Sequence, residues 1–345
     1  MKTTAALLVE LAKPLEVVEI EIPALKPGQV LVEIAFSGVC HTQVLEARGR
    51  RGADPYVPHC LGHEGSGTVI EAGAGVTKVK AGDCVILSWI KGSGLNVAGT
   101  TYTWDGRTVN AGAVTTFQRH AVVSENRLTR MPEGLAMNEA VMLGCALPTG
   151  LGAVVNTACP TVGQSVAVFG AGGIGQSAIM GAAVAGCVPL IAVDPNPAKR
   201  ELALRFGATH VIDPTTTDAV AEIRKLTAGG ADHAIEATGI PAVMAQTLAC
   251  VRPQGGRAVV IGNAPQGQMI SVNPRMLNDG RSLLGCWGGD AVPDRDYPRF
   301  ARLMTSRRIN VAPLLSAPYP LARINEALDD LEEGRVGRPL IDLAL

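Results

Sequence analysis

The sequence predicts an α/β protein of two domains, in which a mostly β part comes first and a doubly wound parallel sheet follows. The chain has 345 residues, which is long for one hydrophobic core. Its first part consists of short apolar segments separated by glycine and proline. From about Gln164, short apolar runs alternate with helix-length segments, a rhythm typical of parallel sheets with right-handed crossovers.

Strands with turn residues between them fill the first part of the chain. One predicted strand ends at Pro23, and the next begins after the Pro27-Gly28 turn. Asp105-Gly106 separates two short runs, and because this pair suits a type I′ turn it predicts a hairpin over 100–110. The other strands expected here cover residues 15–22, 29–35, 67–71 and 83–87.

The second part alternates strands with helices. The expected strands cover residues 165–170, 190–193, 210–212, 233–236 and 257–261, and the expected helices cover 174–185, 197–206, 217–226 and 241–250. After them, two amphipathic helices, 297–307 and 321–333, are expected to fold back onto the first domain. The predicted domains are 1–147 together with 288–345, and 148–287.

Charge is balanced, with 30 basic and 31 acidic residues and no long run of either sign. This gives no electrostatic case for nucleic acid or an anionic membrane as partner. Residues 140–193 contain no charged side chain, which permits a membrane helix or a strand-turn-helix-strand buried on both faces. Pro148, Pro160 and Pro189 interrupt the run, so we favour the buried α/β segment and a soluble protein.

The cysteine pattern points to a reducing compartment. The eight cysteines include no closely spaced pair, so the sequence shows neither a disulfide framework nor a Cys-x-x-Cys zinc knuckle. The apolar run within residues 1–10 is too short for a signal peptide. We therefore expect a cytoplasmic protein.

A glycine motif predicts a dinucleotide site. Gly170, Gly172 and Gly175 follow an apolar strand and open a helix, and Asp194 comes 19 residues after the last glycine. In such a motif the first glycine makes the turn, the second lets the backbone approach the pyrophosphate, and the third permits close packing of helix on strand. Asp194 would accept the ribose hydroxyls and repel a 2′-phosphate, which favours NAD over NADP. Lys199 and Arg200 nearby keep NADP open.

Cys40, His63 and Cys145 could bind one metal ion. Two thiolates and one imidazole make a three-ligand zinc site with an open fourth position, the arrangement that catalytic zinc uses. Taken alone, each residue has a plainer role, because a lone cysteine is more often a core residue and a lone histidine is usually just hydrogen-bonded.

Nine segments of the chain, in order, match one family. They are Gly38-Val-Cys-His-Thr42, Gly62-His-Glu-Gly-Ser-Gly67, Gly82-Asp83, Leu143-Gly-Cys145 with Thr149-Gly150, Gly170-Ala-Gly-Gly-Ile-Gly175, Asp194, Gly207-Ala208, Ser271-Val-Asn-Pro274 and Arg338. Over essentially its whole length the chain resembles the zinc-dependent medium-chain alcohol dehydrogenases. The resemblance implies a GroES-like catalytic domain and a Rossmann coenzyme domain.

The resemblance also implies residue roles. Cys40, His63 and Cys145 are then the zinc ligands, Glu64 is a carboxylate near the metal, and Thr42 accepts the alcohol's proton. The residues implied in cofactor binding are His41, Thr149, Gly170, Gly172, Gly173, Ile174, Gly175, Asp194, Lys199, Ile261 and Arg338. His41 and Arg338 would neutralise the pyrophosphate, and Lys199 would contact the adenosine ribose. Trp89 would line the substrate pocket, where core packing is its plainer role.

The chain departs from its relatives at three places. Leu45 stands where many relatives have the histidine that ends the proton relay, and Gln43 stands where aspartate is common. Residues 90–99 contain none of the four cysteines of the structural zinc site, so we expect one zinc per chain.

The expected function is hydride transfer between NAD and an alcohol and its aldehyde or ketone, by a homodimer or a tetramer. The alternatives are an NADP-dependent carbonyl reductase or zinc-free enone reductase of the same superfamily, and a non-catalytic nucleotide-binding relative. The Cys, His, Cys set disfavours the enone reductase, and Thr42 with that set disfavours the non-catalytic relative.

Overall fold

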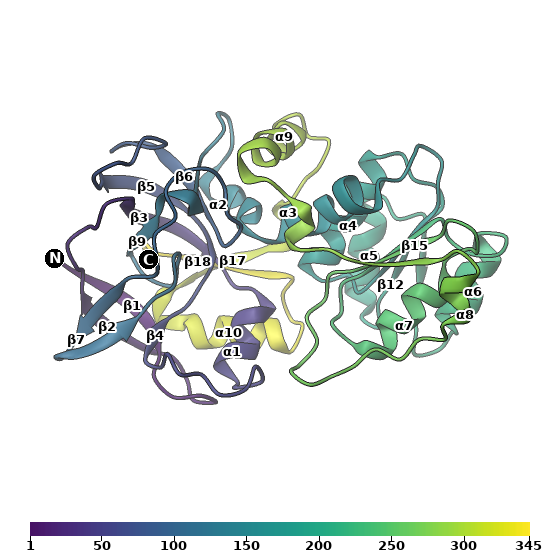
Figure 1. The fold of residues 1–345 in the computed structure, drawn as a ribbon, viewed down its shortest axis with the longest axis horizontal. Coiled ribbons are helices and arrows are strands. Elements are labelled where there is room, and N and C mark those ends of the chain that lie inside the picture. Colours follow the sequence, from purple (N-terminus) through teal and green to yellow (C-terminus); the bar gives the residue numbers. More distant parts are fainter. The chain divides into compact units, whose positions relative to one another are not determined.

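The computed structural model describes all 345 residues, which form two compact units. The first unit comprises residues 1–145, 292–306 and 311–345, and the second comprises 146–291 and 307–310. Figure 1 shows β-strands as the main elements of the first unit and a sheet covered by helices in the second.

The first unit is built from a closed barrel and a seven-stranded sheet. The barrel strands, in spatial order, are β1 (Lys2–Leu8), β2 (Glu16–Glu21), β7 (Thr101–Trp104), β8 (Arg107–Asn110) and β4 (His59–Cys60). The sheet runs β10 (Leu128–Arg130), β6 (Cys84–Ser88), β5 (Glu64–Ala72), β3 (Gln29–Gly38), β18 (Arg338–Asp342) and β17 (Leu315–Pro320), with β9 (His120–Ser124) paired to β3. The predicted hairpin is confirmed, since β7 pairs antiparallel with β8 and both Asp105 and Gly106 have positive φ, as a type I′ turn requires.

The helices of the first unit are α1 (His41–Ala47), α2 (Met137–Ala140), α9 (Pro293–Thr305) and α10 (Ile324–Glu332). The sequence did not predict the strands β1, β4, β9, β10, β17 and β18 or the helices α1 and α2. It placed the start of α9 four residues late, at Tyr297 instead of Pro293. Pro293 occupies the first turn of α9. A backbone N–H there would have no partner within the helix, so a proline costs no hydrogen bond at this position.

The second unit is a six-stranded parallel sheet in the order β13 (His210–Ile212), β12 (Leu190–Val193), β11 (Val166–Phe169), β14 (His233–Glu236), β15 (Arg257–Val260) and β16 (Ser282–Gly285). Its helices are α3 (Ala146–Gly152), a π-helix (Ala153–Ala158), α4 (Gly173–Val184), α5 (Pro197–Arg205), α6 (Ala219–Leu226), α7 (Pro241–Cys250) and α8 (Arg275–Asn278). The predicted doubly wound sheet is confirmed, although the sequence did not predict β16.

Alternate residues of β11 belong to two different cores. Val166 and Val168 pack with Ile179 of α4, whereas Ala167 and Phe169 pack with Leu248 of α7. The strand is thus buried on both faces, which explains the absence of charge around it. The chain has no single helix that is long and apolar enough to span a bilayer. The consecutive helical segments 137–144 and 146–158 reach that length and apolar composition only when they are taken together, and most of their residues are buried in the protein.

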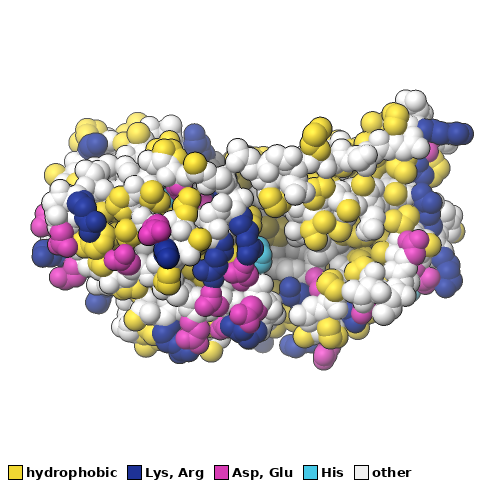
Figure 2. All heavy atoms as spheres, turned by 90° about the horizontal axis from the view of Figure 1, so that it is seen from below, with side chains coloured by type: hydrophobic (Ala, Val, Ile, Leu, Met, Phe, Trp, Pro, Cys, Tyr) yellow, Lys and Arg dark blue, Asp and Glu magenta, His cyan; other side chains and the backbone are white.

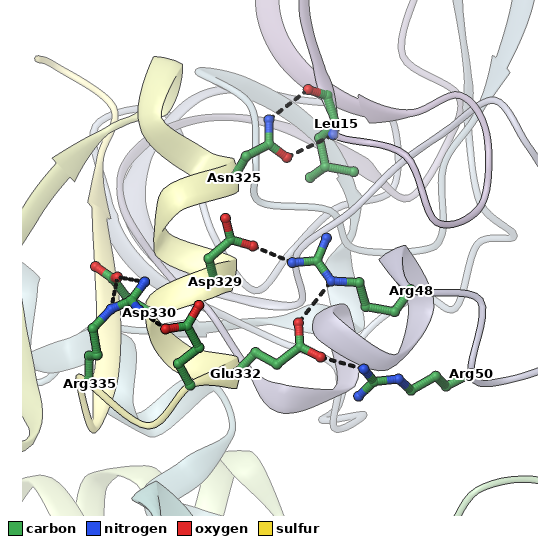
Figure 3. A network of polar contacts seen from close by, with 9 residues as sticks. Leu15, Arg48, Arg50, Asn325, Asp329, Asp330, Glu332 and Arg335 are labelled. Atoms are coloured by element: carbon green, nitrogen blue, oxygen red, sulfur yellow. Dashed lines mark hydrogen bonds and ion pairs between the residues drawn. The ribbon is translucent and has the colours of Figure 1, made fainter.

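Ion pairs fasten α1 to α10 in the first unit (Figure 3). Arg48 at the end of α1 pairs with Asp329 and donates from Nε to Glu332 at 2.9 Å, and Arg50 donates to the other oxygen of Glu332 at 2.5 Å. Asn325 exchanges two hydrogen bonds with the backbone of Leu15. The network holds the helix that begins beside Cys40. On the face drawn in Figure 2, acidic and basic side chains lie interspersed.

Glu125 accepts backbone N–H groups from two separate loops of the first unit. Its side chain is buried, and its carboxylate accepts the backbone N–H groups of Thr77 at 2.7 Å, Lys78 at 2.8 Å and Leu95 at 2.6 Å. These hydrogen bonds outweigh the effect of burial and lower the pKa of Glu125 below its ordinary value of 4.5.

We expect Glu125→Gln to lower the free energy of unfolding by about 1–3 kcal/mol near neutral pH, since an amide nitrogen cannot accept from a buried N–H. A carboxyl whose folded pKa is depressed stabilises the protein above its unfolded pKa. That contribution disappears as the pH falls through the folded value. Urea denaturation across this acidic range should show the difference between the two proteins shrinking. The exposed Glu133→Gln is the control, and an equal effect from it would contradict the prediction.

Candidate active site

Three segments of the first unit bring Cys40, His63 and Cys145 together. Cys40 directly precedes α1, His63 lies between β4 and β5, and Cys145 follows a 3-10 turn over Val141–Gly144. One candidate ligand atom from each residue lies within 4.8 Å of the other two. Nε2 of His63 is 3.3 Å from Sγ of Cys145. Residues 105 positions apart in the sequence thus form one cluster of donors.

Strand pairing and two glycines bring the segments that carry Cys40, His63 and Cys145 close together. β3 runs antiparallel to β5 with Ser37 opposite Gly65, which places the end of one strand beside the start of the other. A Cβ on Gly38 would lie 2.6 Å from Oε1 of Glu64, and one on Gly144 would lie 2.7 Å from Cβ of Glu64. Only glycine allows the backbones before Cys40 and Cys145 to approach Glu64 so closely.

The three donors fit zinc. Zinc takes thiolate sulfur at about 2.3 Å and imidazole nitrogen at about 2.0–2.1 Å in a tetrahedral arrangement, so ligand atoms lie roughly 3.5–3.8 Å apart. The 3.3 Å contact and the 4.8 Å limit bracket this spacing. Three protein ligands leave the fourth position for a substrate oxygen.

The two thiols differ in acidity. A hydrogen bond from Cys145 lowers the pKa of Cys40 well below its ordinary value, and the Arg338 guanidinium acts in the same direction. The pKa of Cys145 is raised, because it holds the proton of that hydrogen bond and is buried. Because metals bind cysteine as the thiolate, a metal ion held here would need both sulfurs deprotonated.

Glu64 and Arg338 form a buried ion pair beside the ligands. Oε1 of Glu64 lies 2.5 Å from Nη2 of Arg338, and their side chains are 0% and 4% exposed. Burial raises the pKa of Glu64, while Arg338 opposes that shift. The guanidinium offsets negative charge in a site that holds two cysteines and a carboxylate. The pyrophosphate role of Arg338 remains a prediction.

Thr42 and Trp89 also lie next to the ligands. Oγ1 of Thr42 is 3.7 Å from Sγ of Cys40, and the Trp89 ring meets His63 edge-on with ring centroids 6.4 Å apart. Trp89 also packs against the core of the first unit, and its role in a substrate pocket stays a prediction. Leu45 lies half-buried in α1, and His41 begins that helix with an exposed side chain.

Gln43 is a site residue whose role the sequence did not reveal. It is 1% exposed, and its amide bonds both to the backbone of Cys40 and to the ring of His63. Its position at the third residue of α1 could have pointed to the first contact, because glutamine there often caps the helix. Nothing in the sequence pointed to the second contact.

The glycine motif takes the expected form in the second unit. Gly170 directly follows β11 and has a φ of 86°, a conformation that other residues rarely adopt. A Cβ on Gly175 would come within 1.7 Å of the Gly170 carbonyl oxygen, so α4 can pack against the turn only with glycine there. A Cβ on Gly172 would meet nothing within 4 Å, which leaves its backbone open to a ligand. Gly173 and Ile174 begin α4, whose N-terminal amides suit a phosphate.

Asp194 follows β12 and is buried, at 6% exposure. Its Oδ2 accepts the Ala171 N–H at 2.8 Å and its Oδ1 accepts the Asn196 N–H at 2.8 Å, so the carboxylate is held beside the glycine turn. Arg200, which could favour a phosphate, pairs with Asp213 at 3.0 Å and donates to the carbonyls of Asp194 and Pro195. This arrangement keeps Arg200 occupied within the protein.

Three other predicted cofactor residues lie in the same unit. Thr149 is buried in α3, Lys199 lies in the first turn of α5, and Ile261 directly follows β15. Asp194 and Ile261 both lie at carboxyl ends of strands, where doubly wound sheets bind their ligands. The strand order changes direction between β11 and β14.

Glu236 is a second residue that the sequence did not single out. It ends β14, is fully buried, and accepts the N–H groups of Thr238 and Gly239 at 2.6 and 2.8 Å through Oε1. Its Oε2 accepts the Gly262 N–H at 3.2 Å. Glu236 therefore shapes the turn against which Gly170 packs.

Comparison with known proteins gives consistent matches along the chain. The family described as "Alcohol dehydrogenase GroES-like domain" matches residues 26–133, and that described as "Zinc-binding dehydrogenase" matches residues 173–306. An S-(hydroxymethyl)glutathione dehydrogenase of Synechocystis is 36% identical, and an alcohol dehydrogenase class-3 of Cereibacter sphaeroides is 34% identical. Each comparison covers 99% of this chain and 100% of the relative.

Two solved structures of dehydrogenases match the fold of the whole chain. An alcohol dehydrogenase zinc-binding domain protein from Burkholderia ambifaria matches with a TM-score of 0.93 at 31% identity. Benzyl alcohol dehydrogenase from Acinetobacter calcoaceticus matches with a TM-score of 0.91 at 29% identity. Both comparisons cover 99% of each chain.

Proposed function

Because the chain belongs to the zinc-dependent medium-chain alcohol dehydrogenases, we propose that it reversibly oxidises primary or secondary alcohols to aldehydes or ketones with NAD. The observation that carries this function is the cluster of Cys40, His63 and Cys145, with a threonine hydroxyl 3.7 Å from one sulfur. Zinc held there supplies a Lewis acid that polarises the substrate oxygen.

Three residues near the metal ligands have the other roles in the proposed reaction. The Thr42 hydroxyl accepts the alcohol's proton as it passes its own proton on toward water, and it lies 3.7 Å from the Cys40 sulfur. Arg338 balances the charge of Glu64 and the thiolates. Trp89 narrows the space beside His63 and so limits the shape of alcohol that fits.

A spectrophotometric panel tests the function. Primary, secondary and aromatic alcohols, S-(hydroxymethyl)glutathione and the matching carbonyl compounds would each be offered with NAD or NADP, or with the reduced forms. S-(hydroxymethyl)glutathione and, among the aromatic alcohols, benzyl alcohol are included because similar proteins are named as dehydrogenases of these two compounds. We expect formation of reduced nicotinamide with at least one alcohol and NAD. No turnover of any alcohol or carbonyl by zinc-loaded protein would contradict the proposal.

The assembly we propose is a homodimer, with a tetramer as the alternative. The support is β16, which ends the sheet and pairs on one side only, with β15. An edge strand of this kind can pair with a second copy. Trp287, two residues after that strand, is 76% exposed. A cytoplasmic setting is also proposed, because Cys40 and Cys145 must stay reduced to bind zinc.

Cofactor preference should depend on Asp194. We expect Asp194→Gly to relax the preference for NAD over NADP by about 1.5–3 kcal/mol, since a carboxylate hydrogen-bonds the ribose hydroxyls and repels an added phosphate. The ratio of kcat/KM for the two cofactors, measured for both proteins, checks this. Asp218→Asn is the matched control, because Asp218 is an exposed residue of the same unit that caps α6 by accepting the Ala221 N–H, a hydrogen bond that asparagine can also accept. A wild-type preference for NADP would show that this account of Asp194 is wrong.

A further inference from the structure

Cys145 lies in irregular backbone and is not held by pairing within either sheet. It follows the 3-10 turn over Val141–Gly144 with φ of −153° and ψ of −69°, and it is the last residue of the first unit before the chain enters the second. The last carbonyls of a helical turn have no partner within the turn. The place of Cys145 therefore depends on what holds the carbonyl of Gly144, directly before it.

The hydroxyl of Ser88, at the end of β6, holds that carbonyl. Oγ of Ser88 lies 2.7 Å from the Gly144 carbonyl oxygen, 2.6 Å from the hydroxyl of Tyr297 in α9 and 3.0 Å from the backbone nitrogen of Ile90. Ser88 and Tyr297 are 2% and 0% exposed. At this depth each polar atom depends on a partner within the protein.

The directions of these hydrogen bonds follow from the chemistry of the partners. A carbonyl oxygen only accepts, so the single proton of the Ser88 hydroxyl is donated to Gly144. The Tyr297 hydroxyl and the Ile90 N–H then both donate to the serine oxygen. Burial raises the pKa of Tyr297, so its hydroxyl keeps the proton that it donates. Ser88 thus donates once and accepts twice, which is the full capacity of a hydroxyl.

The backbone of Ser88 is tied to the segment of a second ligand. β6 pairs antiparallel with β5, and Ser88 lies opposite Glu64, the residue after His63. A Cβ on Gly144 would lie 2.6 Å from the carbonyl oxygen of Leu87, so the turn before Cys145 runs directly against the end of β6. We propose that Ser88, held by Tyr297, is a positioning residue of the zinc site that fixes the place of Cys145 relative to His63.

This role of Ser88 rests on zinc binding in the proposed function, and it has a consequence for affinity. In Ser88→Ala the Gly144 carbonyl loses its donor and the Tyr297 hydroxyl loses its acceptor. We expect zinc affinity to fall by about 10-fold. This is the lower end of the range of roughly 10–100-fold for residues behind metal ligands, because Ser88 acts through the backbone before Cys145 and not on the sulfur itself. Ser88→Thr keeps the hydroxyl and should recover most of the lost affinity.

Ser66→Ala is the matched control. Ser66 is a fully buried serine of the same sheet, in β5, and its hydroxyl donates to the Met137 carbonyl oxygen at 2.7 Å. The control therefore loses an equivalent buried hydrogen bond to a helical carbonyl, away from the backbone that carries Cys145. Urea denaturation should show similar losses of stability in the two alanine variants, whereas only Ser88→Ala should lose zinc affinity.

Competition with a chelator of known zinc affinity measures the effect, and the visible spectrum of cobalt-loaded protein reports the geometry of the site. We expect Ser88→Ala to shift the cobalt bands and Ser66→Ala to leave them unchanged. If Ser88→Ala does not fold, Tyr297→Phe takes its place, with a loss of zinc affinity in the same direction. Unchanged zinc affinity in the folded variant, or an equal loss in Ser66→Ala, would overturn the inference and leave the proposed function standing. Wild-type protein that binds no zinc would overturn both.

Discussion

Replacing Cys40 or Cys145 with alanine is expected to remove the zinc and lower alcohol oxidation by on the order of 10³-fold or more. The stabilisation that a metal gives to developing charge amounts to several kcal/mol, and each 1.36 kcal/mol corresponds to about tenfold in rate. Two remaining ligands would not keep the metal in place against water. Metal analysis of the purified variants and their turnover with NAD check both parts of the prediction.

Cys60→Ala is the matched control for these variants. Cys60 is as deeply buried as the two ligands, at 3% exposure, and lies in the same unit, but it packs in the hydrophobic core of the barrel. Burial raises the pKa of its thiol, so it stays protonated. The control should keep one zinc per chain and its turnover. Full zinc content in Cys40→Ala would show that the ligand set is wrong.

Thr42→Ala should lower turnover by about 10²–10⁴-fold with the zinc retained. The hydroxyl near Cys40 is the group that we assign to take the alcohol's proton, and positioned proton transfer contributes about that much. Thr42→Ser keeps a hydroxyl on the same carbon and should stay close to wild type. Steady-state rates beside zinc content separate loss of proton transfer from loss of metal.

The exit of that proton is where this chain differs from many relatives. Leu45 has no atom that can accept a proton, so release goes directly to water or through another group, of which His41 is the nearest in sequence. Leu45→His should raise the rate at lower pH by adding a base. Near-wild-type turnover of zinc-loaded Thr42→Ala would mean that the proton leaves by a different route.

Five of the six strands of the second unit and the four helices that alternate with them could be predicted from the sequence, whereas α3, the π-helix and α8 could not. These strands and helices alternate with clear apolar periodicity, and the glycines at 170, 172 and 175 announce the turn between β11 and α4. Parallel strands buried on both faces leave a strong local signal. β16 is an exception, because Ser282–Gly285 is a half-buried edge strand with a short and weak apolar pattern.

The first unit was harder to predict, because its elements depend on distant pairing. β18 pairs with β3 from the far end of the chain, with Leu340 opposite Gly38. The sequence around either residue contains no pattern that predicts this pairing. The metal ligands could be named because the segments around them resemble a family. The contacts of Gln43 and Glu125 could not, since hydrogen bonds to loop backbones leave no periodic trace in the sequence.

Zinc reconstitution tests most directly the claim that activity depends on one zinc ion per chain. Chelator-treated protein would be titrated with zinc while NAD-linked alcohol oxidation and bound metal are followed together. The account predicts that activity returns in proportion to bound zinc and stops rising at one zinc per chain, with Cys40, His63 and Cys145 as its ligands. Full activity without zinc, or activity that needs a second zinc per chain, would contradict it.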